Sequence, residues 1–281
     1  MSDSVVPDFA TTLRLQLRTQ LLGQPLHFFP TLDSTNTYAA RLAREGAPEG
    51  TSVIADAQSG GKGRLGRTWV SPAGVNLYLS VILRPPVLAT IAPQLSLLAA
   101  VAVVDAIAEV CQLSPTIKWP NDILIDGKKV CGILAEMQTE GDVLRAVILG
   151  IGVNINATAS AFPEELREKA SSLLLTGGRT VDRSVFTDSL LTHLEKFYVL
   201  WLEEGFSALR STWEKYAAYL IGKRIVVAAP EGTIAGHVLG MDADGALLVQ
   251  GEGSGKQHRL LAGDVTVIEG YNYGDDYDPR R

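Results

Sequence analysis

Residues 60–67 read GGKGRLGR and place three cations, Lys62, Arg64 and Arg67, among four glycines. Glycine lets the backbone approach a ligand closely and turn through positive φ. Cations held between glycines can surround an anion from several directions. A solvated basic loop has a similar composition and is the plain alternative. The stretch therefore predicts a loop that closes over a phosphate or a carboxylate.

The same residues contain the pattern G-x-G-x-x-G, but the flanking sequence argues against a dinucleotide fold. Such a fold needs the glycines to end a strand and open a helix. Residues 51–57 fit a strand, whereas residues 68–74, TWVSPAG, contain a proline and a glycine and have no helical period. The kinase motifs His-Arg-Asp and Asp-Phe-Gly are missing, and no Walker lysine precedes a serine or threonine. These familiar nucleotide-binding folds are therefore excluded.

Composition limits the class of protein further. The 281 residues are 46% hydrophobic, which is ample for one large core domain and a small second domain. The net charge of −6, from 31 acidic and 25 basic residues, argues against a general nucleic-acid binder. We expect the local basic residues to serve a small anionic ligand.

Targeting and redox signals favour a cytoplasmic protein. Two cysteines, Cys111 and Cys131, form neither a disulfide framework nor a zinc-binding spacing. The first residues lack the cationic and apolar segments of a signal peptide. The apolar stretch 95–110 is interrupted by Asp105 and Glu109 and is too short to span a bilayer. We expect it to be a core helix, and we expect no membrane partner.

The elements predicted before residue 221 mix helices with hairpins. Hydrophobic spacing predicts helices at 8–22, 35–45, 93–112, 184–202 and 206–219, and strands at 51–57, 76–83, 116–119, 123–125, 130–138 and 144–150. Asp126-Gly127 suits a type I′ turn between two of the strands. This pattern favours an α+β domain over residues 1–221, in which helices cover one mixed sheet.

The predicted secondary structure changes after Ile221, from helices to short β segments. Five short β segments, at 224–229, 233–241, 246–250, 257–260 and 265–269, are separated by glycine-rich turns. They predict a small SH3-like barrel over residues 222–270. Residues 271–281 read YNYGDDYDPRR, beginning at Tyr271, and predict a disordered tail.

Three further motifs carry polar groups at predicted strand or helix ends. KWPND, residues 118–122, joins two strands, and its Asn121 and Asp122 can hold a ribose, a metal-bound water or the amide edge of a ligand. GIGVNIN, residues 150–156, carries Asn154, whose amide can read a base edge. Turn formation explains both motifs equally simply.

The remaining candidates lie near the predicted loop. Ser34-Thr35-Asn36 opens a helix, and capping by Ser34 is the simpler explanation, although a helix start also suits a polar ligand. Gln58 ends the strand before the glycine loop. Lys129 starts an apolar strand and can point into a site, although surface lysines are far commoner.

Taken in order, these motifs resemble those of the biotin protein ligases. The order is STN, Q-x-GG-K-G-R-L-G-R-x-W, SPxGxNLYLS, KWPND, a lysine before CGIL, and GIGVNIN. The resemblance is close over residues 31–156 and extends less specifically through the C-terminal barrel. It implies a class II synthetase-like catalytic domain, with a mixed sheet covered by helices, that uses ATP to attach biotin to a lysine of a biotin carboxyl carrier domain.

The resemblance also implies a role for each candidate. The biotin site would comprise Ser34, Thr35, Asn36, Gln58, Lys62, Gly63, Arg64, Lys129 and Gly132, with the backbone of 62–64 closing over the ligand. The ATP site would comprise Arg64, Arg67, Trp69, Asn121, Asp122, Lys129 and Asn154. Lys129 and Arg64 would be catalytic, and Asp122 would hold Mg²⁺, directly or through water. Lys62 occupies a position at which the family more often has arginine. The lysine keeps the positive charge but lacks the planar, forked guanidinium group of arginine.

Two relatives of this family remain as competing predictions. Some members carry an N-terminal helix-turn-helix and repress transcription, but only about thirty residues precede Ser34, so we expect an enzyme that does not bind DNA, as a monomer or a homodimer. Octanoyl transferases share the fold and use a cysteine thioester without ATP. Cys131 is the candidate nucleophile, but its flanks are apolar, where cysteine is usually inert.

Overall fold

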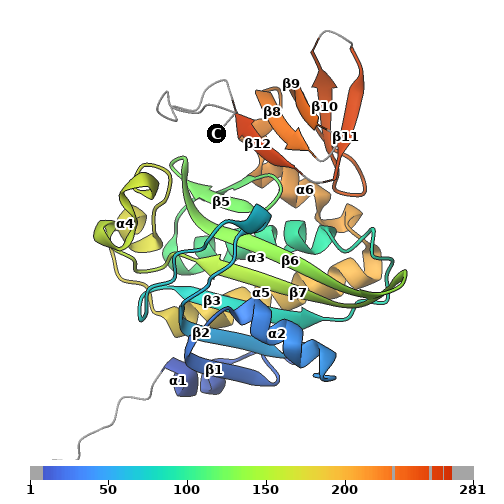
Figure 1. The fold of residues 1–281 in the computed structure, drawn as a ribbon. Helices are drawn as coiled ribbons and strands as arrows, with labels where there is room; N and C mark the ends of the chain where they lie inside the picture. The colour runs from blue at the N-terminus through green and yellow to red at the C-terminus, as the bar shows by residue number, and fades with distance from the viewer. Residues whose placement is uncertain (1–8, 230–231, 253–254, 262, 268–281) are drawn as a thin grey trace, which may run out of the picture.

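The computed structural model describes residues 9–229, 232–252, 255–261 and 263–267. A seven-stranded sheet with helices on both faces forms the larger part, and a five-stranded antiparallel sheet forms the smaller C-terminal part (Figure 1). The α+β class and the small β domain predicted from the sequence are confirmed. The predicted tail, 271–281, lies outside the described residues.

The larger sheet is mixed, with the strand order β1-β2-β3-β7-β6-β5-β4. β1 and β2 are parallel, and the other neighbouring strands are antiparallel. The strands, in chain order from β1 to β7, are Leu26–Leu32, Ser52–Gln58, Leu77–Leu83, Thr116–Lys118, Asp122–Ile125, Lys128–Glu140 and Val143–Val153. Asp126 and Gly127 have φ of 49° and 76°, as the predicted type I′ turn between β5 and β6 requires.

One face of this sheet carries the main core. α3 (Gln94–Cys111) packs there with α5 (Arg183–Glu204), and both lie behind the sheet in Figure 1. Among the described residues, α3 is the one helix long and apolar enough to cross a membrane, but 72% of it is buried inside the protein. It is therefore the core helix that the sequence predicts.

The other face is covered by α2 (Thr35–Arg44), which lies in front of the sheet in Figure 1. Ala39 and Ala43 of α2 pack on the buried side chains of Val53, Ile82 and Ile148. Beyond the start of α2 the same face carries three glycines, Gly132, Gly150 and Gly152. Leu134 and Ser80 flank Gly150 in register there, and Tyr78 and Gly132 flank Gly152. This arrangement leaves a hollow on the sheet.

The N-terminal helix is shorter than predicted. α1 (Phe9–Gln16) stops well before residue 22. The backbone amides of Gln20, Leu21 and Leu22 donate to the carboxylate of Glu195 on α5, at 2.8–2.9 Å. These bonds replace the helical ones, and the chain turns toward β1, a strand that the sequence analysis missed.

The two remaining helices are short. α4 (Leu173–Gly177) follows the segment after β7, and α6 (Ser207–Tyr216) follows α5. α6 ends earlier than predicted and continues as one 3₁₀ turn, Ala218–Leu220. Ser172 caps α4, because its hydroxyl accepts from Leu175 N at 3.1 Å.

The smaller sheet has the order β11-β10-β9-β8-β12. Its strands, from β8 to β12, are Arg224–Ala229, Gly232–Met241, Leu247–Gly251, Gln257–Leu260 and Asp264–Val267, close to the predicted segments. It contacts the larger domain near α3, where Gln94 Nε2 donates to Asp244 O at 2.9 Å. Gln94 is itself fixed, because Trp201 Nε1 donates to its Oε1 at 2.7 Å.

Candidate active site

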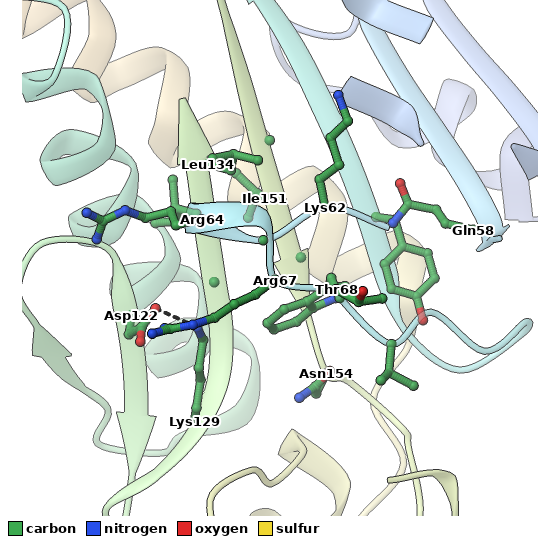
Figure 2. A pocket seen from close by; sticks show the side chains of 18 of the residues that line it. Gln58, Lys62, Arg64, Arg67, Thr68, Asp122, Lys129, Leu134, Ile151 and Asn154 are labelled. Carbon is green, nitrogen blue, oxygen red and sulfur yellow. Dashed lines mark ion pairs between the residues drawn. The ribbon is translucent and has the colours of Figure 1, made fainter. Parts of the chain in front are cut away.

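A cavity of about 230 Å³ lies between the glycine loop and the hollow face of the larger sheet. Every residue that the sequence analysis predicts for the site lines this one cavity. They are Ser34, Thr35, Asn36, Gln58, Lys62, Gly63, Arg64, Arg67, Trp69, Asn121, Asp122, Lys129, Gly132 and Asn154. Figure 2 shows several of these side chains converging from the loop and from the strands.

The floor of the cavity depends on glycines that leave room for other side chains. A Cβ on Gly152 would lie 2.7 Å from Cε2 and Nε1 of Trp69, and one on Gly132 would lie 3.0 Å from Cζ3. A Cβ on Gly150 would lie 2.2 Å from Asn36 Oδ1. Real Cβ atoms essentially never show contacts under 3.0 Å. The indole and the amide can therefore rest on the sheet only because these positions carry no side chain.

One end of the cavity is a closed polar network. Gln58 Oε1 accepts from both N and Oγ1 of Thr35, at 2.8 and 3.1 Å. Ser80 Oγ contacts Thr35 Oγ1 at 2.8 Å and Asn36 Oδ1 at 2.6 Å. Ser34 caps α2 as predicted, with its side chain accepting from Thr37 N. These buried groups offer a small polar ligand fixed donors and acceptors.

The glycine loop covers the cavity as a short hairpin. Lys62 and Thr68 form an isolated antiparallel bridge, and Trp69 N donates to Gly61 O at 2.9 Å. Leu65 and Gly66 at the tip have φ of 55° and 74°. Glycine adopts such a φ without strain, so Gly66 allows the tip to turn. The loop is thus closed at its base and can be held by its side chains.

Arg64 ties the loop to two other parts of the protein. Its Nη1 donates to Asn121 Oδ1 at 2.9 Å, and its Nη2 donates to Gly263 O at 3.1 Å. Asn121 is fixed in turn, because its Nδ2 donates to Ile133 O at 2.5 Å. Gly263 belongs to the smaller domain, so Arg64 joins the loop, the KWPND segment and that domain.

Lys129 lines the cavity beside Asp122. Its Nζ is 2.6 Å from Asp122 Oδ1 and 5.4 Å from the centroid of the Trp69 ring. Figure 2 shows Lys129 and Asp122 reaching toward one another. The backbone of Lys129 is fixed on both sides, because its N donates to Lys169 O and its O accepts from Ser171 N. The ammonium group is therefore presented to the cavity from a rigid strand.

Asn154 also lines the cavity, two residues beyond Gly152, over which the Trp69 ring lies. Its Nδ2 donates to Ser171 O at 3.0 Å, so Oδ1 is the side-chain atom oriented to accept a hydrogen bond from a ligand. An acceptor suits the 6-amino group of adenine.

The sequence analysis missed one wall of the cavity. Phe162, Leu166, Lys169 and Ala170, from the segment between β7 and α4, also line it. A parallel bridge between Lys129 and Ala170 holds this segment in place. The segment contains two short 3₁₀ turns, Ala159–Ala161 and Glu164–Leu166, and has no periodicity in its sequence. The cation at Lys169 was therefore its visible signal, and a lysine alone indicates a surface position.

The cavity is strongly cationic. Five cations line it, Lys62, Arg64, Arg67, Lys129 and Lys169, whereas Asp122 is the one carboxylate that does so among the described residues. The whole chain has a net charge of −6. This local reversal of sign favours a ligand with several negative charges.

The cysteine alternative does not fit this geometry. Cys131 is fully buried and does not line the cavity. Burial raises the pKa of its thiol well above the usual range, which disfavours the thiolate needed for attack. Cys131 is a core residue.

Most of the residues that line this cavity fall within a match to the biotin/lipoate A/B protein ligase family. That family's model matches residues 28–154, and the model of the biotin protein ligase C-terminal domain matches residues 220–267.

Known relatives agree with this class. The chain is 44% identical over 238 residues to the bifunctional ligase/repressor BirA of Bacillus subtilis, covering 85% of this chain and 73% of that one. It is 38% identical to the biotin–[acetyl-CoA-carboxylase] ligase of Paracoccus denitrificans, with 78% and 91% covered. The solved biotin protein ligase of Aquifex aeolicus, in complex with biotin and ATP, is similar at 29% identity and a TM-score of 0.74, with 86% and 97% covered. The chain belongs to the biotin protein ligase family.

Proposed function

We propose that the protein is an ATP-dependent ligase that activates biotin as biotinyl-5′-AMP and transfers it to a lysine of a biotin carboxyl carrier domain. The observation that carries the proposal is a cationic cavity that is lined both by the Thr35–Gln58 network and by Trp69 and Lys129. Such a cavity fits a ligand with a polar ring at one end, a carboxylate in the middle and a nucleotide at the other end.

In the first half-reaction, a carboxylate oxygen of biotin attacks the α-phosphorus of ATP, and pyrophosphate leaves. The ureido ring of biotin lies against Ser34, Thr35, Asn36 and Gln58, under the backbone of 62–64. Lys129 contacts both the carboxylate and the α-phosphate, and it stabilises the charge that develops between them. Arg64 and Arg67 offset the charge of the remaining phosphates. Holding the two substrates in line supplies much of the acceleration.

Adenine binds at the other end of the cavity. Its ring stacks on Trp69, which rests on Gly132 and Gly152. Its amino group donates to Asn154 Oδ1. Because guanine carries a carbonyl oxygen at that position, Asn154 selects ATP over GTP.

In the second half-reaction, the amine of the carrier lysine attacks the acyl carbon, an amide bond forms and AMP leaves. The protein supplies no nucleophile of its own. Lys129 again lies beside the reacting carbon and stabilises the oxyanion. The acceptor we favour is a carboxylase carrier, as the name of the Paracoccus denitrificans relative suggests. The protein acts in the cytoplasm as a monomer or a homodimer.

Magnesium fits this site only together with ATP. Among the described residues, no group of three or more His, Cys, Asp or Glu side chains could hold a metal ion. Asp122 is a single carboxylate, and Mg²⁺ commonly binds one or two carboxylates plus substrate phosphates and water. Asp122 would contact the ion, directly or through water, and the ion would offset phosphate charge.

The loop protects the mixed anhydride from water. Arg64→Gly removes the hydrogen bonds to Asn121 and Gly263 and frees the loop. We expect the variant to form biotinyl-5′-AMP but to release it about tenfold faster. Release is measured by chasing labelled adenylate from the enzyme with unlabelled ligand. Retention equal to that of the wild type contradicts the role of Arg64 in the lid.

Transfer to an acceptor tests the complete reaction. The purified protein is incubated with ATP, biotin and an unmodified carrier domain, and the acceptor is analysed by mass spectrometry. We expect one biotinyl group on one lysine, dependent on ATP. The same carrier with that lysine changed to arginine is the control. Modification of both carriers, or transfer without ATP, contradicts the proposal.

A further inference from the structure

Glu136 connects two parts of the site that are far apart in the sequence. Its Oε2 accepts from Asn36 Nδ2 at 2.7 Å, and its Oε1 lies 3.7 Å from Lys62 Nζ. Asn36 belongs to the polar end of the cavity, and Lys62 stands at the base of the glycine loop. Glu136 lies on β6 just beyond Leu134 and does not line the cavity itself. The mechanism above leaves this carboxylate without a role.

The contact with Asn36 fixes the orientation of its amide. An ionised carboxylate only accepts hydrogen bonds, so it selects Nδ2 on its side. Oδ1 is thereby turned to Ser80, whose hydroxyl donates to it at 2.6 Å. Asn36 is only 4% exposed, so an amide in the wrong orientation would leave buried groups unpaired. Glu136 thus keeps the polar wall in one arrangement.

The contact with Lys62 holds the loop at a second point, separate from the contacts of Arg64. Figure 2 shows the side chains of Lys62 and Arg64 leaving the loop in different directions. The Lys62 and Glu136 side chains are 45% and 39% exposed. Such a pair contributes modestly and is weakened by salt. It is suited to a loop that must open in each catalytic cycle.

We propose that Glu136 is a positioning residue, which orients Asn36 for the biotin ring with one oxygen and holds the glycine loop through Lys62 with the other. This inference rests on the proposed function for its biotin part. It implies that the loop is held at two points, by Arg64 toward the smaller domain and by Lys62 toward β6. Lys62 then supplies a point charge to Glu136. This contact does not require the planar guanidinium group of an arginine.

Substitutions at Glu136 and Lys62 separate the two contacts. Glu136→Gln keeps an acceptor for Asn36 and loses the charge facing Lys62, so adenylate release rises about two- to fivefold at low salt while the KM for biotin stays near wild type. Glu136→Ala loses both contacts, and the KM for biotin also rises about fivefold with little change in kcat. Lys62→Gln removes the same ion pair from the loop side. In the double variant Lys62→Gln/Glu136→Gln, adenylate release is therefore no faster than in either single variant, because all three variants lose the same ion pair and keep an acceptor for Asn36. Additive effects of the two substitutions on release overturn the ion pair.

Loop opening can be measured without any ligand. Glu136→Gln leaves the loop sequence intact, so trypsin cleavage after Lys62, Arg64 or Arg67 reports opening directly. Glu140→Gln is the matched control, because Glu140 lies on the same strand and pairs with Arg145 at 2.7 Å, not with the loop. We expect faster cleavage in Glu136→Gln alone, and no difference in 1 M salt, where screening is nearly complete.

The two readouts separate the inference from the proposed function. Faster cleavage without any biotin chemistry would retain the loop contact and reject the ligase assignment. Normal biotin adenylation with wild-type cleavage, release and KM in every Glu136 variant would retain the ligase and overturn the inference.

Discussion

Replacing Lys129 with alanine lowers the rate of biotinyl-5′-AMP formation by about 10²–10³-fold. The ammonium group lies 2.6 Å from Asp122 Oδ1 and 5.4 Å from the centroid of the Trp69 ring, on the wall of the cavity. Without it, the biotin carboxylate and the α-phosphate approach one another with no charge between them. Loss of the pair also leaves Asp122 facing the phosphates, which adds repulsion. The rate is measured as biotin-dependent release of pyrophosphate.

The adjacent Lys128 provides the matched control. Its Nζ pairs with Glu168 at 3.7 Å and it does not line the cavity. Lys128→Ala removes the same charge from the chain, and we expect a rate within about twofold of wild type. Near-normal pyrophosphate release by Lys129→Ala, or an equal loss in both variants, contradicts the assignment of Lys129.

Two alanine substitutions on β7 separate the biotin end from the ATP end. Gly152→Ala places a Cβ 2.7 Å from the Trp69 indole, so the ring shifts and the KM for ATP rises about 10–100-fold. Gly150→Ala places a Cβ 2.2 Å from Asn36 Oδ1, so the polar wall shifts and the KM for biotin rises by a similar factor. Each variant should leave the other substrate's KM within a few-fold of wild type. Steady-state kinetics with each substrate varied in turn provides the comparison.

A third glycine controls for the general effect of adding a methyl group. A Cβ on Gly177 of α4 would lie 3.5 Å from its nearest neighbour, an ordinary contact. Gly177→Ala should change neither KM, and thermal unfolding should show that all three variants fold. If Gly150→Ala and Gly152→Ala raise both KM values together, the cavity is not divided as proposed.

The composition of the site was predictable because its residues fall in short ordered motifs. The glycine loop and GIGVNIN lie far in the sequence from KWPND and Lys129, and antiparallel pairing of β3, β7, β6 and β5 brings these motifs to one cavity. Helix α2 was predictable from its cap, Ser34, and the hairpin from Asp126-Gly127. In each of these cases the signal is local.

What the sequence could not predict depends on distant contacts. α1 stops early because Glu195, on α5, accepts from the amides of residues 20–22. The wall around Lys169 is held by a bridge to Lys129, and no periodicity marks it. The contact of Arg64 with Gly263 joins residues 199 positions apart. The sequence predicts the loop and the barrel, but their contact requires the folded chain.

Biotin-dependent exchange of labelled pyrophosphate into ATP tests the central claim most directly. The purified protein is assayed with biotin, lipoate or octanoate as the acid, and Lys129→Ala serves as the inactive control. The account predicts exchange with biotin and ATP, none with lipoate or octanoate, and loss of exchange in the variant. Exchange that occurs with lipoate alone, or exchange that occurs when no acid is added, would contradict the account.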